Sequence, residues 1–241
     1  MFLLESISWK EANDYFKNND IVILPIGSTE QHGPHNPLGT DFLIAEELAK
    51  ELSKRTNLLV LPTVPYGVSF HHSNFPGTIS IDEEIFTQYV YNIVKSLKKY
   101  GINKILIING HGGNYYPLLR VSRLARMELN MIVYIFQWWT ALAGKISIFS
   151  KEEEGHAGAM ETSLIAYFKP GMVNMLNCED EKSVMKEINE ASRYVFTDEI
   201  TSNGVFGKSC SASREKGLIV MEKAIEMLLH MVEHLKNIKI E

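Results

Sequence analysis

The loop at residues 27–35, Gly-Ser-Thr-Glu-Gln-His-Gly-Pro-His, concentrates carboxylate and imidazole groups in a short stretch. In extended backbone, side chains two residues apart point to the same side, so Glu30 and His32 can approach one cation together. Asp41 lies at the expected start of the next helix and could close the site. These groups suit zinc, manganese or iron(II), and a carboxylate can bridge two ions. The alternative is capping and surface polarity, but clustering at a strand end favours a metal site.

A glycine-rich turn, Asn-Gly-His-Gly-Gly-Asn at 109–114, is the second candidate. Its glycines let the backbone approach a ligand closely and expose amide donors before a helix N-terminus. A phosphate-binding turn is the alternative, although the spacing matches neither a P-loop nor a dinucleotide fingerprint. Because the turn contains His111, a metal-ligating role is favoured over phosphate binding, with His111 as the ligand. Gly112, Gly113 and Asn114 are candidate substrate contacts.

The third candidate is the segment 156–161, His-Ala-Gly-Ala-Met-Glu, in which a glutamate falls in the first turn of an expected helix. His156 could exchange a proton with the substrate while Glu161 binds metal or assists catalysis. The alternative for Glu161 is a favourable interaction with the helix dipole. His72, in a loop rich in proline and glycine, is a candidate substrate contact. Four further side chains are interpreted as structural: Trp138, Trp139, His230 and His234.

These groups must be positioned by alternating strands and helices. Short apolar runs predict strands, and apolar residues at helical spacing behind capping residues predict helices. Such alternation predicts right-handed crossovers and a mainly parallel sheet with helices on its faces, an α/β fold whose active site lies beyond the carboxyl strand ends. The expected strands are 21–26, 58–64, 104–108 and 131–136, and the expected helices are 42–52, 82–100, a segment ending at 128, 160–168 and 214–236.

Length and composition limit the remaining possibilities. The 241 residues, 45% of them hydrophobic and 22% charged, predict one domain over 1–241. A formal net charge of -5 argues against a nucleic-acid partner. Cys178 and Cys210 form no CxxC pair and are interpreted as free cytosolic thiols. Neither a signal peptide nor an apolar run of membrane-spanning length is found, so we expect no membrane association and a cytoplasmic location.

Taken together, the motifs resemble those of the creatininase (creatinine amidohydrolase) family, and they fall in the family's order. Shorter matches extend the likeness over most of the chain, at 65–67, 75–78, 204–207 and 212–213. The principal motifs are Gly-Ser-Thr-Glu-Gln-His-Gly-Pro-His at 27–35 with Asp41, Asn-Gly-His-Gly-Gly-Asn at 109–114, and His-Ala-Gly-Ala-Met-Glu-Thr at 156–162.

This resemblance implies a three-layer α/β sandwich, a homohexamer, and a two-metal centre of zinc, manganese or iron that generates hydroxide and polarises an amide carbonyl. Asp41 would bridge the two ions, and His156 matches the family's proton-transfer histidine. The residues that match the family's metal ligands are Glu30, His32, Asp41 and His111.

The sequence departs from creatininase itself at two places. Where that enzyme has Tyr-Glu after the matching histidine, the Glu being a ligand, this chain has Gly112 and Gly113, and Glu161 is the candidate replacement. The Trp-Asp pair expected just before His156 is replaced by two glutamates at 152–153. The branch with Gly-His-Gly-Gly-Asn also resembles deformylases of a formylaminopyrimidine nucleotide in riboflavin and deazaflavin (F420) synthesis, and a peptidase that matures a redox-cofactor peptide.

The resulting expectation is a metal-dependent amidohydrolase that cleaves a small non-peptide or cyclic amide. Deformylation of a formylaminopyrimidine ribonucleotide is the alternative within the same chemistry. A non-catalytic phosphate or nucleotide binder would instead use the 109–114 turn and bind its ligand regardless of chelator. A purely structural assembly protein would tolerate alanine at Glu30 and His32 without effect beyond stability.

Overall fold

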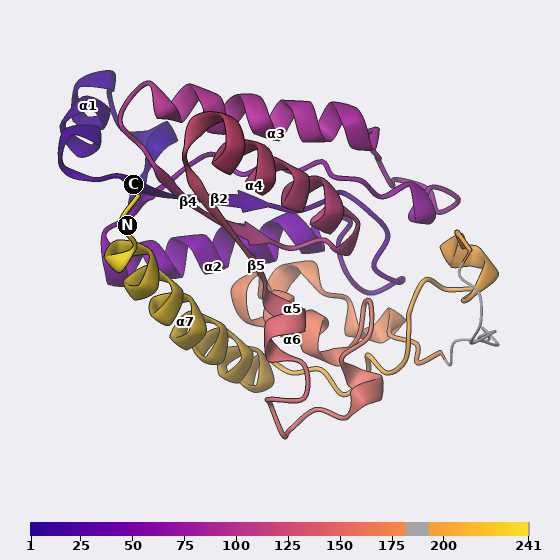
Figure 1. Ribbon diagram of the computed structural model, residues 1–241. Helices are drawn as coiled ribbons and strands as arrows, with labels where there is room; N and C mark the ends of the chain where they lie inside the picture. Colours follow the sequence, from indigo (N-terminus) through magenta and orange to yellow (C-terminus); the bar gives the residue numbers. More distant parts are fainter. Residues whose placement is uncertain (182–192, 241) are drawn as a thin grey trace.

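A parallel β-sheet forms the centre of the computed structural model, which describes residues 1–181 and 193–240 (Figure 1). Neighbouring strands lie in the order β1-β3-β2-β4-β5, and each adjacent pair is parallel. The strands are β1 (Phe2–Leu3), β3 (Leu59–Val60), β2 (Ile21–Ile26), β4 (Lys104–Asn109) and β5 (Ile132–Gln137). β2 and β4 are buried along their whole length, as expected where helices cover both faces.

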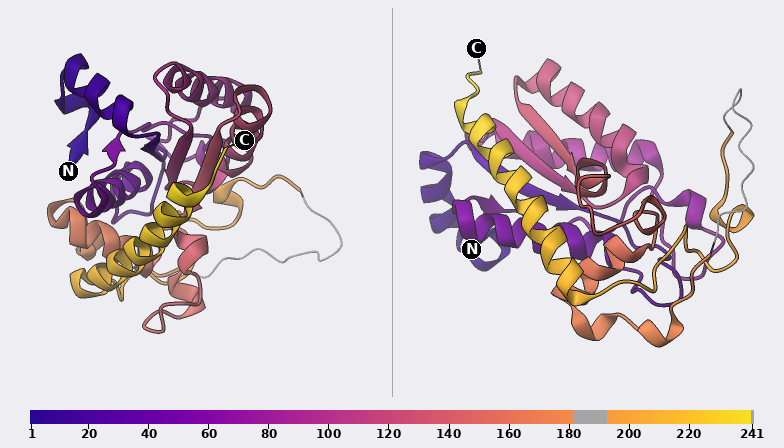
Figure 2. Two further views of the ribbon diagram at one scale, coloured as in Figure 1. Left: turned by 60° about the vertical axis from the view of Figure 1, so that its left-hand side comes forward. Right: turned by 90° about the horizontal axis from the view of Figure 1, so that it is seen from below.

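Helices cover both faces of this sheet and make three layers. One face carries α1 (Trp9–Asn18), α3 (Glu83–Lys98) and α4 (Tyr115–Leu129). The other carries α2 (Thr40–Thr56), the short α5 (Trp138–Leu142), α6 (Ala159–Phe168) and α7 (Arg214–Asn237). Figures 1 and 2 show α3 and α4 together on one side, with α7 lying beside α2 on the other. The expected three-layer α/β fold is confirmed.

Several elements differ from the sequence expectation, among them the short β1 and α5, which were not expected. The expected strand 58–64 is regular only at Leu59–Val60. Val60 pairs with Ile23 but Val64 bridges Ile26, so one extra residue breaks the register with β2. Helix α1 was not expected, although Ser8 and Glu11 form a capping box at its start.

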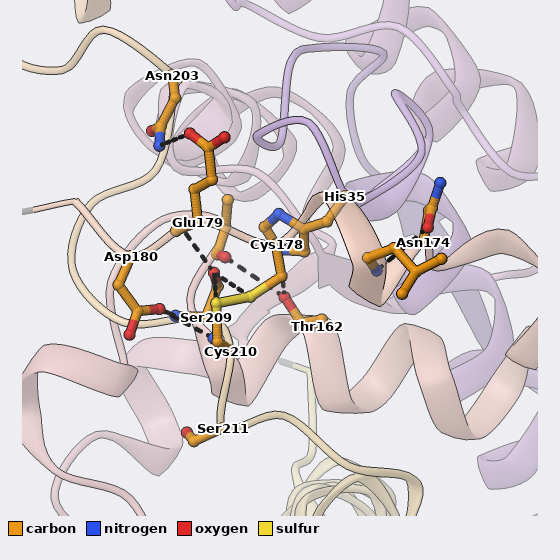
Figure 3. Close-up of a disulfide and its surroundings, with 12 residues drawn as sticks. His35, Thr162, Asn174, Cys178, Glu179, Asp180, Asn203, Ser209, Cys210 and Ser211 are labelled. Carbon is orange, nitrogen blue, oxygen red and sulfur yellow. Dashed lines mark hydrogen bonds between the residues drawn. A yellow bond between two sulfur atoms is a disulfide. The ribbon is translucent and has the colours of Figure 1, made fainter.

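The prediction that Cys178 and Cys210 are free thiols is wrong. The two residues form a disulfide with their Cα atoms 5.5 Å apart (Figure 3). Cys178 follows α6 and Cys210 precedes α7, and these two helices pack against each other, so their flanking loops converge. The backbone N–H of Cys210 donates to Asp180 Oδ1 over 3.0 Å and fixes the two loops together. A sequence separation of 32 residues gives no sign of this contact.

Within the described ranges 1–181 and 193–240, no helix combines the length and apolarity needed to cross a membrane.

Candidate metal centre

The carboxyl ends of β2 and β4 bring the two principal motifs to one place. Ile26 pairs with Asn109, so the loops that follow these neighbouring strands start at the same level of the sheet. The first loop carries Glu30 and His32, and the second carries His111. All three side chains are buried where the loops meet.

Asp41 enters the same site from the first turn of α2. Its backbone is pressed against the ends of both strands: a Cβ added to Gly110 would lie 2.2 Å from the Asp41 carbonyl oxygen, and one added to Gly27 would lie 2.3 Å from Phe42 N. Only glycine permits this approach. Gly110 of the 109–114 turn therefore serves backbone packing around Asp41, which accounts for this glycine without a bound phosphate.

The first group of ligand atoms is Glu30, Asp41 and His111, whose nearest ligand atoms lie within 4.8 Å of one another. His111 Nδ1 is 3.0 Å from Glu30 Oε2 and 3.0 Å from Asp41 Oδ2. All three residues are buried.

The second group is His32, Asp41 and Glu161, again within 4.8 Å. His32 Nε2 is 3.0 Å from Asp41 Oδ1 and 3.6 Å from Glu161 Oε2. Asp41 thus turns one carboxylate oxygen toward each group. This arrangement is that of a carboxylate able to bridge two cations.

Hydrogen bonds to the far side of each ring set the orientation of the two histidines. His111 Nε2 lies 2.9 Å from the Val68 carbonyl oxygen, and His32 Nδ1 lies 3.2 Å from the Glu30 carbonyl oxygen. When those nitrogens donate, the lone pairs of His111 Nδ1 and His32 Nε2 face the carboxylates. Metal-binding histidines are commonly held by this kind of second hydrogen bond.

Apart from the short contacts that the ligand atoms make with one another, three of them are buried without a hydrogen-bond partner among the described residues: Glu30 Oε2, His32 Nε2 and Asp41 Oδ2. Buried polar atoms are nearly always paired, so a convergent unpaired set indicates a missing partner. Oxygen and imidazole donors fit zinc, manganese or iron(II). The residues present therefore fit the divalent cations that the sequence predicts.

The electrostatics of the site also fit cation binding. Burial opposes ionisation of Glu30, but the charge and hydrogen bond of His111, with a smaller contribution from His72, together outweigh it and lower the pKa of the carboxyl group to about 2. Burial likewise opposes protonation of His111, whereas Glu30 and Asp41 raise its pKa to about 10. The pKa of His32 is raised against burial by Asp41 and Glu161. Protons on the two histidines thus offset the carboxylate charge, and cation binding would release them.

His156 lies over the same centre, with its ring centroid 4.4 Å from that of His32 and 4.5 Å from that of His72. Its Nε2 is 3.0 Å from the Gln31 carbonyl oxygen. Burial and the positive charge of His32 lower the pKa of His156, so the imidazole is neutral at pH 7 and able to accept a proton.

The predicted substrate contacts lie in different surroundings. Gly112 and His72 line the cavity over the centre, and His72 Nε2 is also 3.3 Å from Glu30 Oε1. Gly113 is packed against the Val68 carbonyl oxygen, where a Cβ would lie at 2.0 Å. Asn114 is fully buried behind the cavity, where its amide donates to the Gly27 carbonyl oxygen and accepts from Val68 N. Asn114 and Gly113 therefore hold the loops together rather than face the cavity.

The cavity has a volume of about 200 Å³ and includes residues that sequence reasoning did not select. Trp138 is buried as expected, but both it and Trp139 line the cavity. Their position directly after β5, a strand next to β4, was the available signal. The other lining residues not selected include His71, Glu154, Met160 and Phe206.

Gly110→Ala is expected to displace Asp41, because the new methyl group would overlap the Asp41 carbonyl oxygen. Overpacking of this kind costs about 1–3 kcal/mol of stability, and bound metal should fall with it. Gly112→Ala is the control, since its Cβ would meet only Trp139 at 3.9 Å. Thermal unfolding and metal content should change in the first variant and not in the second; equal metal content in both would contradict the role of Gly110.

Comparison with known proteins identifies the family. The family model described as creatininase, creatinine amidohydrolase, matches residues 5–232. The chain belongs to the creatininase family. The creatinine amidohydrolase of Pseudomonas putida is 27% identical over 91% of this chain and 92% of that protein. A solved creatininase structure superposes with a TM-score of 0.89 over 98% of both chains at 24% identity. A creatininase mutant of "Zn-Zn type" superposes with a TM-score of 0.86 over 97% of this chain and 98% of that chain at 25% identity.

Other relatives of this chain carry the names of different hydrolytic reactions. The mycofactocin precursor peptide peptidase of Mycolicibacterium smegmatis is 30% identical over 82% of this chain and 78% of that protein. A 2-amino-5-formylamino-6-ribosylaminopyrimidin-4(3H)-one 5'-monophosphate deformylase of Methanothermus fervidus is 25% identical over 92% and 88%. The match to 3-dehydro-scyllo-inosose hydrolase of Thermotoga maritima spans only 53% of that protein. The predicted enzyme class, a hydrolase of carbon–nitrogen bonds other than peptide bonds, is confirmed by the creatinine amidohydrolase and deformylase relatives.

Proposed function

We propose that this creatininase-family enzyme is a metal-dependent amidohydrolase that cleaves the carbon–nitrogen bond of a small non-peptide or cyclic amide. The observation that carries the proposal is the sharing of Asp41 between two groups of ligand atoms, with one oxygen toward His111 and the other toward His32. A site for two cations among the buried lining residues of a cavity suits hydrolysis better than binding alone.

Two divalent cations, of zinc, manganese or iron, would occupy these groups. Among the structural neighbours, one creatininase is titled "Zn-Zn type" and another "Creatininase Mn". Such a pair would supply an activated water and polarise the amide carbonyl. The first ion would be held by Glu30, Asp41 and His111, and the second by His32, Asp41 and Glu161.

The remaining polar groups of the cavity would act on the substrate or on the ligands. His156, neutral at pH 7, would take a proton from the attacking water and pass it to the departing nitrogen. His72 would orient Glu30 through its Nε2 while Thr197 Oγ1, 2.7 Å from Nδ1, fixes the ring. Gly112 would contact the substrate through its backbone.

The second candidate is deformylation of a formylaminopyrimidine ribonucleotide, supported by the Gly-His-Gly-Gly-Asn motif and the deformylase relative.

The experiment that tests the proposed function is metal analysis of the protein purified without added ions, followed by a hydrolysis screen of formamides, cyclic amides and short peptides. We expect about two ions per chain and turnover of a formamide or cyclic amide that chelator removes. Absence of bound metal, or turnover unaffected by chelator, would contradict the proposal.

Glu161→Gln is expected to reduce the bound metal from two ions to one. Its Oε2 belongs only to the second group, and an amide binds divalent cations far less well than a carboxylate. The backbone N–H of Ala157, which donates to Glu161 Oε2 over 2.8 Å, can still donate to the glutamine oxygen, so the fold should be kept. Metal titration monitored by calorimetry would show this; two ions at unchanged affinity would remove Glu161 from the ligand set.

We also propose a homohexamer, as the family resemblance implies. Light scattering on the purified protein should then give a particle six times the 27.4 kDa mass of the chain. A monomer at micromolar concentration would contradict this.

The cytoplasmic location stays a prediction, and the disulfide counts against it because such crosslinks are rare in the cytosol.

A further inference from the structure

The cavity over the candidate metal centre is lined by four acidic side chains: Glu30, Asp41, Glu154 and Glu161. Three of them belong to the two groups of ligand atoms. The fourth, Glu154, lies outside both groups. No lysine or arginine lines this cavity in the part of the chain that the structure describes.

Glu154 is held in place by the backbone. Its Oε1 accepts a hydrogen bond from Gly144 N over 3.0 Å, and it directly precedes Gly155 and His156, which line the same cavity. Gly155 is packed against the Phe206 carbonyl oxygen, where an added Cβ would lie at 1.9 Å. The carboxylate is therefore anchored next to the residue proposed to transfer the proton.

Charge balance distinguishes Glu154 from the other acids. Two divalent cations would bring four positive charges, against three negative charges from the ligand carboxylates and one from the hydroxide that the reaction consumes. Those charges cancel and leave the Glu154 carboxylate as the net charge of the cavity. Trp139 and Phe206 line the same space, and aromatic faces attract cations.

We propose that Glu154 selects the substrate of this enzyme by charge, favouring an amide that carries an ammonium, amidinium or similar cationic group and disfavouring one that carries a phosphate or carboxylate. This inference rests on the proposed function, because it concerns the substrate of the same site. A volume of about 200 Å³ also limits the buried part of the substrate to a small molecule. A nucleotide monophosphate would meet repulsion here rather than a basic partner.

Three hydroxamates of matched size test this without knowledge of the substrate, because a hydroxamate binds divalent metal centres. They are β-alanine hydroxamate with an ammonium group, butyrohydroxamate with none, and succinic monohydroxamate with a carboxylate. Their dissociation constants would be measured by calorimetry on the full chain loaded with zinc. We expect the ammonium compound to bind about tenfold more tightly than the carboxylate compound, with the neutral one between them.

Glu154→Gln should reduce that ratio to about twofold, because glutamine keeps the acceptor for Gly144 N and removes only the charge. The matched control is Glu152→Gln, an exposed glutamate two residues away that does not line the cavity. It should leave the ratio at about tenfold. Tighter binding of the carboxylate compound, or an unchanged ratio in Glu154→Gln, would overturn the inference while leaving the metal centre intact. Failure of all three compounds to bind would overturn the proposed function, and this inference with it.

Discussion

Asp41→Asn is expected to lose both bound cations and to reduce kcat/KM by at least about ten-thousandfold. Asp41 is the only residue shared by the two principal groups of ligand atoms in the described structure, and its two oxygens each lie 3.0 Å from a different histidine. Asparagine keeps the shape but removes the charge and one of the two carboxylate oxygens. Activation of water and polarisation of the amide carbonyl each contribute several kcal/mol, and both depend on the cations. Metal analysis and steady-state kinetics would measure the two losses together.

Loss of metal must be separated from loss of the fold. Asp41 repels Glu30, but its pairs with His32 and His111 lower its own pKa, so the metal-free variant should stay folded and unfold at a somewhat lower temperature than the metal-free parent. Glu51→Gln, on the same helix but at its surface beside Lys54, is the control and should keep both ions. Full metal occupancy in Asp41→Asn would refute the bridging assignment.

His156→Ala should keep both cations and lose about a hundred- to ten-thousandfold in kcat, the range that general acid–base catalysis contributes. The nearest groups to His156 Nε2 are the backbone oxygen and side-chain amide of Gln31, at 3.0 and 2.9 Å, which are not metal ligands. Substrate binding should change little, so KM is expected to stay within a few-fold. Single-turnover kinetics on the metal-loaded variant would isolate the chemical step.

The comparison variant for this experiment is His230→Ala, an exposed histidine on α7 that should leave kcat unchanged.

Glu30, His32 and His156 also form a group of potential ligand atoms within 4.8 Å. A variant that loses one cation along with turnover would therefore show that His156 is a ligand, and proton transfer would have to be reassigned.

The fold was largely readable from the sequence because its periodicity is strong. The continuous apolar runs at 21–26 and 104–108 became the fully buried β2 and β4, and the helix expected from residue 82 begins where the Asp82 side chain caps α3. Expectation and structure differ where a local signal is interrupted. An extra residue between Val60 and Val64 shortens β3, since it breaks the register with β2.

The candidate site was partly readable for the same reason. Residue types and their positions after strands selected Glu30, His32 and His111, because parallel strands place their carboxyl ends at one edge of the sheet. The segment around His156 was selected by its residue types, by its place at an expected helix start and by its resemblance to the family's motif. That it packs its ring within 4.4 Å of His32 depends on contacts between residues 124 positions apart.

The sequence by itself therefore determined the layers of the fold, the strand ends at which chemistry could occur, and the kinds of metal those side chains can bind. Only the tertiary structure decided that Asp41 divides its oxygens between two groups, that Asn114 supports loops instead of facing the cavity, and that Cys178 and Cys210 are joined. The physical reason is the range of each interaction. Periodicity and capping act over a few residues, whereas ligand sets, cavities and crosslinks depend on distances between segments that only the packed core brings together.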